Sequence, residues 1–450
     1  MELKPKSNTV ESVAIQDLWN ERDVELHLNS DVTFLIGENG TRKTTTINLL
    51  VAALTADLPT LDRIPFTKIS IKLSSAADRT KPVIEIAKKH RKQMPFAEVS
   101  YRIRDTTSGP ATDYSLDEFY DQFDIHKPGY RRRRRVYRQP DGTLIHRQAI
   151  ERKSNEKSIY QHLRELTSVS WLSVHRSPVG TDPGGDSQKS AVDTKVDELS
   201  DRMIRYFSQL EKSASDLVNS FQKEIFFNLL ADRNIPLTTA DNSDDTIKQE
   251  KSSLSDIFEQ FNLHHDQYSA KLEKHFSNYG KAAEKLQNDE PLKTLDIAAV
   301  ILTSRIHSLV QEWTKMKARE NKIHEPRTLF LNLINSFYKR KKLTISDQNE
   351  PVIETAKQKN IPLSYLSSGE KQIFIILGEA LLQENRPSIY VADEPELSLH
   401  VAWQEKLVDS ITSMNPNVQL FIATHSPDIV GRHSDKLIDM GQYFGDDESV

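Results

Sequence analysis

The sequence contains no cysteine, and this absence excludes disulfide bonds, cysteine-ligated zinc sites and thiol catalysis. Such a chain suits a reducing compartment, and we expect a cytoplasmic protein. No apolar run approaches the length of a membrane-spanning helix, and the first residues do not have the pattern of a secretory signal. We therefore expect no membrane partner.

The sequence also has little net charge, only −5 at pH 7. It lacks the overall positive charge of many nucleic-acid-binding proteins, so any such site must be local. Hydrophobic residues make up 37% of the chain and charged residues 28%, which indicates a real core beneath a strongly charged surface. The length of 450 residues predicts more than one domain.

Glycine is scarce, with 14 residues in the whole chain, yet two of them fall in the short segment 34–45. An apolar strand at 31–36 leads into a turn with Gly37 and Gly40, and a helix is expected from Thr45 to about Leu54. Strand, glycine turn and helix are the layout of a phosphate-binding loop. The residues expected to contact a nucleotide here are Gly37, Asn39, Gly40, Thr41, Arg42, Lys43, Thr44 and Thr45.

Two of these residues have expected roles. Lys43 would reach the β- and γ-phosphates, and the Thr44 hydroxyl would bind Mg²⁺. Arg42 stands where the motif has glycine. One alternative is that an arginine is tolerated here if its backbone angles are near helical, and its cation could then face a phosphate. The other is that it weakens nucleotide binding or hydrolysis. A glycine turn without a ligand is the simpler alternative.

Three further motifs follow near the other end of the chain. Residues 366–372 place serine hydroxyls and glycine at the start of a helix, which favours phosphate, and we select Ser368, Gly369 and Glu370 as nucleotide-binding candidates. A strand at 388–392 ends in Asp393, a candidate Mg²⁺ ligand, and Glu394, a candidate for polarising the attacking water. A strand at 419–423 delivers His425 towards the γ-phosphate. A helix cap and two turns explain each motif alone, but the ordered set is far more specific.

These motifs resemble the ABC-class ATPases, in the branch shared with SMC-like, RecF-like and overcoming-lysogenization-defect (OLD) proteins. The resemblance covers residues 10–60 and 360–435. It identifies residues 37–44 as Walker A, 366–372 as the signature, Asp393 and Glu394 as Walker B, 396–400 as the D-loop and His425 as the switch histidine. Gln139 and Gln148 are weak candidates for the Q-loop glutamine.

The resemblance implies an α/β fold, an ABC-type ATPase head with a P-loop parallel sheet and an antiparallel β subdomain, interrupted by a helical or coiled-coil insertion. We expect the N-terminal part of the head at 1–185, the insertion at 186–345 and the C-terminal part at 346–450. Strands are expected at 69–73, 83–86, 99–103 and 168–174, and a hairpin joins 134–137 to 143–146. Apolar heptads begin at Val196, Leu254 and Leu295, and they fit a helical arm packed on itself or a short antiparallel coiled coil.

The resemblance also implies ATP and Mg²⁺ as ligands and two heads that face each other. Ser368 and Gly369 of one head would close over ATP bound at Walker A of the other. The chain is then at least a dimer, and in the nearest group a hexamer is possible.

Within the branch, the chain resembles the ATPase subunits of bacterial anti-phage systems, of the AriA type in PARIS and the PtuA type in Septu. Residues 393–400, Asp-Glu-Pro-Glu-Leu-Ser-Leu-His, carry this likeness. It implies a homo-oligomeric sensor or scaffold that controls a separate nuclease effector, TOPRIM-type or HNH-type, and responds to a phage-encoded trigger protein or DNA. Only 25 residues follow His425, so we expect no TOPRIM domain within the chain.

The strongest local charge is the run Arg131, Arg132, Arg133, Arg134 and Arg135. It fits nucleic-acid phosphate, an acidic protein partner or a solvated hairpin rim. The first alternative leads to a second functional hypothesis, a DNA repair or chromosome-maintenance ATPase that binds DNA through this hairpin. A third is a scaffold in which Arg42 has blunted hydrolysis.

Overall fold

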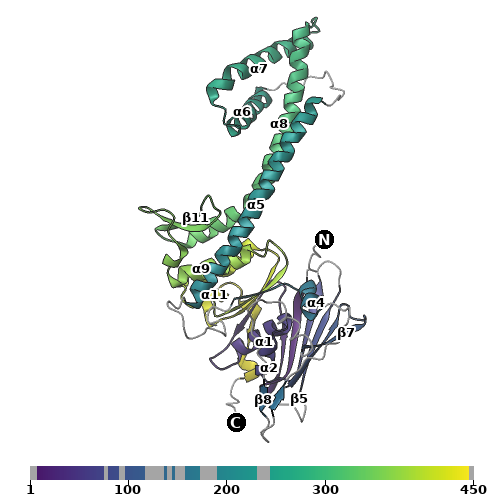
Figure 1. Ribbon diagram of the computed structural model, residues 1–450, viewed down its shortest axis with the longest axis vertical. Coiled ribbons are helices and arrows are strands. Elements are labelled where there is room, and N and C mark those ends of the chain that lie inside the picture. Colours follow the sequence, from purple (N-terminus) through teal and green to yellow (C-terminus); the bar gives the residue numbers. More distant parts are fainter. Residues whose placement is uncertain are drawn as a thin grey trace. The chain divides into compact units, whose positions relative to one another are not determined.

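The computed structural model describes residues 8–75, 80–90, 97–116, 136–138, 144–146, 158–172, 190–230 and 244–444. The chain divides into two compact units. We name Met1–Met203 with Leu329–Val450 the head unit and Ile204–Thr328 the helical unit. Helices α5 (Ala191–Leu230) and α8 (Thr294–Phe337) contribute residues to both units (Figure 1). The boundaries expected near 185 and 345 remain a prediction of domain organisation.

A five-stranded sheet in the order β10-β13-β14-β3-β15 forms the centre of the head unit. All its neighbouring strands are parallel. The strands are β3 (Val32–Ile36), β10 (Val169–Leu172), β13 (Ser388–Asp393), β14 (Val418–Ala423) and β15 (Leu437–Asp439). Every residue of β14 is buried, as expected for an apolar strand covered on both faces.

Helices cover this sheet on both sides. Ile389 and Val391 of β13 share a core with α1 (Lys43–Thr55), whereas the Tyr390 hydroxyl donates to Ile376 O of α9 (Ser368–Leu381) at 3.0 Å. Because successive side chains of a strand point to opposite faces, α1 and α9 lie on opposite sides of the sheet. The predicted P-loop helix and the helix after the signature are thus confirmed.

A second, six-stranded sheet in the head unit is antiparallel, with the order β2-β1-β4-β5-β6-β7. Its strands are β1 (Asn8–Leu18), β2 (Arg22–His27), β4 (Lys68–Ser75), β5 (Val83–His90), β6 (Ala97–Arg104) and β7 (Ala111–Ser115). Its inward residues form one core with α1 and α2 (Leu58–Arg63). The expected combination of a parallel sheet and an antiparallel β subdomain is therefore confirmed.

Shorter elements complete the head unit. Two hairpins pair β8 (Val136–Arg138) with β9 (Leu144–His146) and β11 (Lys341–Ile345) with β12 (Pro351–Thr355). The first is the hairpin predicted from sequence, although its turn lies outside the described residues. The remaining elements are α4 (Ile159–Leu166), η1 (Leu363–Tyr365), α10 (Val401–Met414), α11 (Pro427–Val430), η2 (Ser434–Lys436) and α12 (Gly441–Phe444).

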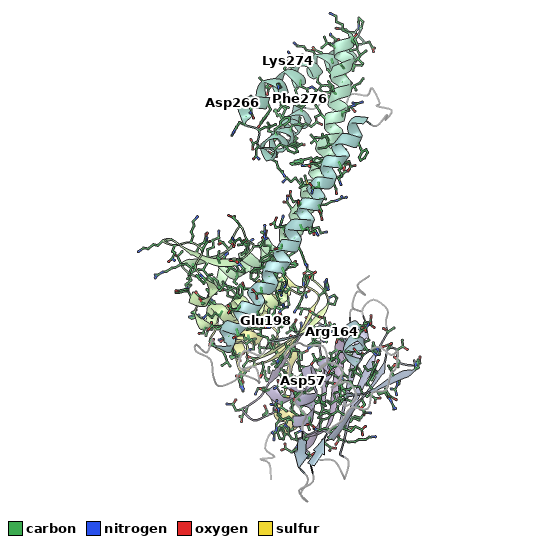
Figure 2. All side chains as sticks on the ribbon, in the orientation of Figure 1. Asp57, Arg164, Glu198, Asp266, Lys274 and Phe276 are labelled. Carbon is green, nitrogen blue, oxygen red and sulfur yellow. The ribbon has the colours of Figure 1, made fainter. Side chains whose placement is uncertain are left out.

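The helical unit packs parts of α5 and α8 with α6 (Asp244–Gln260) and α7 (His265–Gln287). Glu211 pairs with Arg327 at 2.6 Å, and the Phe221 ring lies 5.4 Å from the Trp313 ring. Moving forward along α5 thus means moving backward along α8, so the two helices are antiparallel. Phe276 of α7 enters their shared core, while Lys274 of the same helix is exposed (Figure 2).

The heptads fit either a helical arm packed on itself or an antiparallel helix pair, and the helical unit has features of both. An antiparallel helix pair is present, but α6 and α7 pack against it and share its core. The second run of heptad spacing, at Leu254, Phe261 and Tyr268, is divided between two helices. Leu254 and Tyr268 are buried on separate helices, whereas Phe261 lies in the turn between them and is 46% exposed. Leu295, which opens the third run, is 77% exposed.

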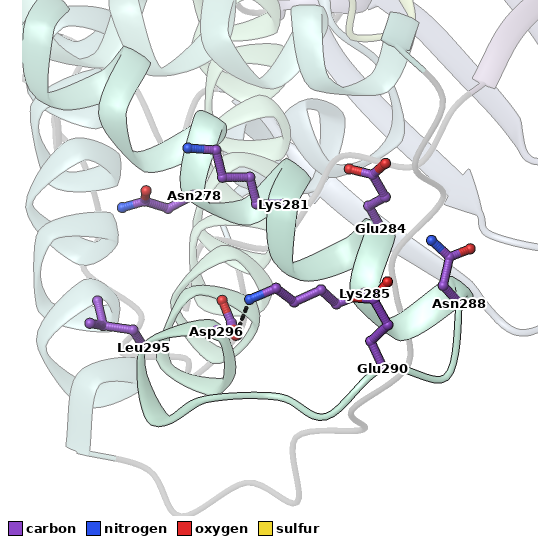
Figure 3. A pocket seen from close by; sticks show the side chains of 8 residues that line it. All are labelled: Asn278, Lys281, Glu284, Lys285, Asn288, Glu290, Leu295 and Asp296. Atoms are coloured by element: carbon purple, nitrogen blue, oxygen red, sulfur yellow. Dashed lines mark hydrogen bonds and ion pairs between the residues drawn. The ribbon is translucent and has the colours of Figure 1, made fainter.

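A polar cavity of about 480 Å³ lies in the helical unit where α7 gives way to α8 (Figure 3). Lys285 and Asp296 form an ion pair of 2.7 Å in its wall. Its other lining residues, which are one lysine, two glutamates, two asparagines and a leucine, are Asn278, Lys281, Glu284, Asn288, Glu290 and Leu295. In the described part of the chain, no helix is both long enough and apolar enough to span a membrane.

Candidate nucleotide-binding site

Three neighbouring strands of the parallel sheet end at the candidate site. β13, β14 and β3 lie side by side in that order, so the loops after them meet at one edge of the sheet. Asp393 closes β13, Thr424 follows β14 and Gly37 follows β3. Ligands of open α/β sheets bind at this carboxyl edge. The sheet therefore gathers three motifs that are far apart in the sequence.

The loop after β3 folds tightly back on itself. Gly37 has a φ of 142° and Gly40 a φ of 95°, angles that residues with side chains rarely adopt. A Cβ on Gly37 would lie 2.7 Å from Thr41 Oγ1. The Thr41 hydroxyl donates to Glu38 O at 2.8 Å and closes the turn. Both the backbone angle and the close approach thus require glycine at position 37.

Lys43 is the first residue of α1, and only 6% of its surface is exposed. Its ammonium donates to Gly37 O at 2.8 Å and to Glu38 O at 2.9 Å, so the side chain reaches back across the loop. Burial lowers the pKa of Lys43, while nearby carboxylates, led by Glu394, act in the opposite direction. A cation is therefore held where the loop and the acidic strand ends meet.

Arg42, the residue that departs from the glycine motif, is the N-cap of α1 with φ 65° and ψ 17°. The condition under which an arginine is expected to be tolerated here, near-helical backbone angles, is not met, because this left-handed conformation is the one that favours glycine. The side chain binds the β1–β2 turn. Its Nη2 donates to Glu21 Oε1 at 2.9 Å, and its Cζ lies 4.8 Å from the centre of the Trp19 ring.

Thr44 and Asp393 form a pair of oxygen ligands at the site. The Thr44 hydroxyl donates to Asp393 Oδ1 at 3.1 Å. A hydroxyl and a carboxylate are the hard oxygen donors that Mg²⁺ prefers, and a P-loop hydroxyl beside a strand-end carboxylate is a common Mg²⁺ arrangement in nucleotide-binding enzymes. The residues present therefore fit a magnesium ion bound together with phosphate.

Glu394 and His425 face each other beside this pair. His425 Nε2 lies 3.8 Å from Glu394 Oε1, and both side chains are about one third exposed. Glu394 has a φ of 47°, and its N–H donates to Ala423 O at 2.9 Å, which fixes it to the end of β14. A non-glycine residue in this region carries strain, and such strain is concentrated at functional sites.

The predicted signature residues form the N-terminus of α9 through a capping box. The Ser367 hydroxyl accepts from Glu370 N, while Ser367 N donates to Glu370 Oε2 at 2.7 Å. Lys341 also donates to Glu370 Oε2, at 2.8 Å. Burial alone would raise the pKa of Glu370, but these hydrogen bonds outweigh it and lower the pKa. Glu370 is 8% exposed, so within its own chain it shapes the turn that presents Ser368.

Gly369 lies against the D-loop. A Cβ on Gly369 would lie 2.5 Å from Ser398 O, so the two backbones touch and no larger residue fits without a shift. One turn further along α9, Gln372 Nε2 donates to Pro395 O at 2.9 Å. The predicted signature is therefore packed on the segment that follows Asp393 and Glu394, whereas Thr44 contacts Asp393 itself.

Sequence reasoning missed two groups of residues at the site. Trp19 and Glu21 hold Arg42 from a turn that has no motif of its own. Glu396 was noted only as part of the D-loop, yet it binds the loop that carries His425. The sequence pattern that could have drawn attention to Glu396 is the presence of three acidic residues within 393–396, at the end of β13. The run Arg131–Arg135 and the Q-loop candidates Gln139 and Gln148 lie outside the described residues.

A family model described as the AAA ATPase domain matches residues 9–430. The chain belongs to this ATPase family. The match extends from the first part of the head unit to its second part, across the residues of the helical unit between them. Comparison with curated proteins finds no match.

Solved structures add distant likenesses to this ATPase-domain protein. One is the Smc head domain with an extended coiled coil bound to the C-terminal domain of ScpA, from Pyrococcus furiosus. It has 12% identity and a TM-score of 0.42, over 96% of this chain and 93% of that chain. Another, the SmcHead bound to the C-winged helix domain of ScpA, has 9% identity and a TM-score of 0.44, over 96% and 94%.

Proposed function

We propose that the protein binds and hydrolyses ATP at the carboxyl edge of its parallel sheet. The observation that carries this proposal is the convergence of Lys43, Thr44, Asp393, Glu394 and His425, which come from three separate motifs. Membership of an ATPase family supports the same conclusion. The tight turn at Gly37 supports it further, because backbone N–H groups of such turns bind phosphate.

Each residue has a role that follows from its position. The Lys43 ammonium now donates to two carbonyls of the loop. With ATP bound, it would donate to the β- and γ-phosphates instead. Glu394 would orient and polarise the attacking water, and His425 would contact the γ-phosphate across from it. Thr44 and Asp393 would hold Mg²⁺. When bound, this ion supplies positive charge that neutralises the phosphate oxygens.

We further propose that a second copy of the chain completes the site. Ser367 and Ser368 are exposed at the N-terminus of α9, and Gly369 is packed on the D-loop. Helix N-termini favour phosphate, so Ser368 and Gly369 could close over a nucleotide held by another copy. The active form would then be at least a dimer, and a hexamer is the larger assembly that we propose for it.

The signature helix α9 also has contacts that would transmit closure. Lys371 pairs with Asp193 at 2.7 Å and Glu379 with Arg202 at 2.9 Å, both on the first part of α5. The Tyr338 hydroxyl, just beyond α8, donates to Glu370 O at 2.9 Å. Within the head unit, α9 is thus bound to both segments that lead to the insertion. Movement of Ser368 towards a nucleotide would displace these segments.

The experiment that tests hydrolysis is release of phosphate from ATP by the natural chain, beside Lys43→Ala and Glu394→Gln. We expect turnover by the natural chain only. Glu394→Gln should still bind ATP, because its fault is in the chemical step, whereas Lys43→Ala should lose binding. Equal turnover in all three proteins would indicate a contaminating enzyme and would contradict the proposal that this site hydrolyses ATP.

We propose as the biological role an anti-phage ATPase scaffold that controls a separate nuclease. The support is the resemblance of residues 393–400 to the ATPase subunits of PARIS and Septu. Native mass spectrometry after co-expression with the neighbouring gene product would test this role. The proposal expects a stable oligomer that retains a TOPRIM-type or HNH-type nuclease and releases it when ATP or a phage-encoded trigger is added.

The alternative role is DNA repair or chromosome maintenance, and Arg131–Arg135 favours it. This alternative expects salt-dependent DNA binding and DNA-stimulated ATP turnover by the protein alone. Replacing the five arginines with serine should then abolish both effects. A chain that does not bind DNA but retains a nuclease would support the defence role.

A further inference from the structure

Glu396 connects two strand ends of the candidate site. It lies two residues beyond Glu394, after β13, and its carboxylate reaches the loop after β14. Glu396 Oε1 accepts from the Thr424 hydroxyl at 2.6 Å, from His425 N at 2.8 Å and from Ser426 N at 3.2 Å. One carboxylate oxygen thus binds three consecutive residues, and His425 is the middle one.

The same short loop is held on its other sides as well. Thr424 N donates to Leu35 O of β3 at 3.1 Å, and the Ser426 hydroxyl donates to Gln404 Oε1 at 2.7 Å. The backbone of His425 is therefore fixed, while its imidazole is left 38% exposed beside Glu394. Of these contacts, only the one from Glu396 binds the His425 backbone itself.

We infer that Glu396 is a positioning residue that holds His425 in place for hydrolysis, an inference that rests on the proposed ATPase function. Hydrogen bonds to a carboxylate are stronger than neutral ones, and three of them converge on one oxygen. The base of this clamp is itself fixed, because Gln372 holds the carbonyl of Pro395, the residue before Glu396. Glu396 therefore fixes the backbone position from which the His425 imidazole extends beside Glu394.

The geometry separates Glu396 from the catalytic role proposed for Glu394. Glu394 Oε1 faces the His425 ring, whereas Glu396 Oε1 is occupied by a hydroxyl and two backbone N–H groups. The other oxygen, Glu396 Oε2, is buried and has no hydrogen-bond partner among the described residues. Neither oxygen is placed to take a proton from an attacking water. Glu396 thus acts through His425.

The test is steady-state ATP hydrolysis and separate ATP binding by full-length variants. Glu396→Ala should lower kcat by about 10- to 100-fold, the range expected for a misplaced catalytic group, and leave KM and the Kd for ATP within about twofold. Glu396→Gln should retain most of kcat, because its amide oxygen can accept the same three hydrogen bonds. Glu396→Asp should be impaired, because the shorter side chain keeps the charge but loses the reach.

A double-mutant cycle with His425→Ala tests whether Glu396 acts only through His425. Glu396→Ala should have no further effect on kcat once His425 is removed. The exposed Glu405→Ala on α10 is the matched surface control and should resemble the natural chain. If Glu396→Ala does not fold, the kcat values of Glu396→Gln and Glu396→Asp still test whether Glu396 positions His425.

Two results would overturn the inference alone. One is an additive loss of kcat in the double variant. The other is a Glu396→Gln variant as inactive as Glu394→Gln, which would make Glu396 a catalytic group. A natural chain that neither binds nor hydrolyses ATP would instead overturn the proposed function, and this inference with it. The two failures are therefore distinguishable in one set of assays.

Discussion

The guanidinium of Arg42 is stacked on Trp19, with its Cζ 4.8 Å from the ring centre, and its Nη2 donates to Glu21. These contacts explain how an arginine occupies a glycine position of the predicted phosphate-binding loop. The left-handed backbone costs about 1–2 kcal/mol for a residue with a Cβ. A partly exposed cation–π contact returns about 0.5–1 kcal/mol and an exposed ion pair about 0–1 kcal/mol.

These magnitudes predict opposite outcomes for two substitutions of Arg42. Arg42→Gly loses the contacts but also the backbone strain, so the free energy of unfolding should change by less than about 1 kcal/mol, and ATP turnover should persist. Arg42→Ala loses the contacts and keeps the strain, so it should be less stable by about 1 kcal/mol. Chemical unfolding of both variants measures this. An equal loss of stability would contradict the strain argument.

The contact between Thr44 and Asp393 predicts how ATP binding depends on magnesium. In the natural chain, chelating Mg²⁺ should weaken ATP binding at least about tenfold, because the ion would join the phosphates to both side chains. Asp393→Asn should remove most of this difference. Titration of a fluorescent ATP analogue with Mg²⁺ or with EDTA measures it. A variant that keeps the full dependence on Mg²⁺ would show that Asp393 does not hold the ion.

The close approach of Gly369 to Ser398 predicts that Gly369→Ala destabilises the head unit. The new Cβ would lie 2.5 Å from a backbone oxygen, so the backbone must shift, at a cost of about 1–3 kcal/mol. Gly280→Ala is the matched control, because Gly280 is an exposed residue of α7 with no atom within 4 Å of the added Cβ. It should stabilise the chain by about 0.5–1 kcal/mol. Thermal unfolding should move in opposite directions for the two variants.

His275 predicts a pH dependence of stability in the helical unit. Burial lowers the pKa of His275, with Glu250 opposing, and its Nε2 lies 3.1 Å from Thr303 Oγ1. Below the ordinary histidine pKa of about 6.5, the unfolded chain takes up a proton that the folded unit does not. Stability should therefore fall as the pH drops from about 7 to about 5.

The variant His275→Gln isolates this contribution. Its unfolding midpoint should change less between about pH 7 and about pH 5 than that of the natural chain. His265→Gln, at an exposed position of the same helix α7, should keep the full dependence. If His275→Gln were as sensitive to pH as His265→Gln, other groups would account for the effect.

The sequence predicted the head unit well, because its strands and motifs are local patterns. The helix at 43–55 and the strands at 388–393 and 418–423 agree with the expected ranges within two residues. Each combines a continuous apolar run with a turn or cap beside it. The meeting of Thr44 with Asp393 was also predictable, since both motifs follow parallel strands.

What the sequence could not predict depends on contacts between distant segments. Trp19 and Glu21 matter because the β1–β2 turn reaches Arg42, and nothing in residues 17–22 shows this. Glu396 matters because the backbone at 424–426 donates to it. The spacing of Leu254, Phe261 and Tyr268 misled for a related reason. Apolar residues seven positions apart can also lie on two successive helices, with the middle residue in the turn between them.

The measurement that tests the composite ATP site most directly is phosphate release from a mixture of two inactive variants, Lys43→Ala and Ser368→Arg. Each variant should be inactive alone, because one lacks the lysine proposed to bind phosphate and the other blocks the segment proposed to close over ATP. A mixed dimer contains one site with an intact loop and an intact signature, so turnover should recover to a measurable fraction of the natural rate. A mixture as inactive as its components, while both variants fold and still pair with the natural chain, would contradict the account.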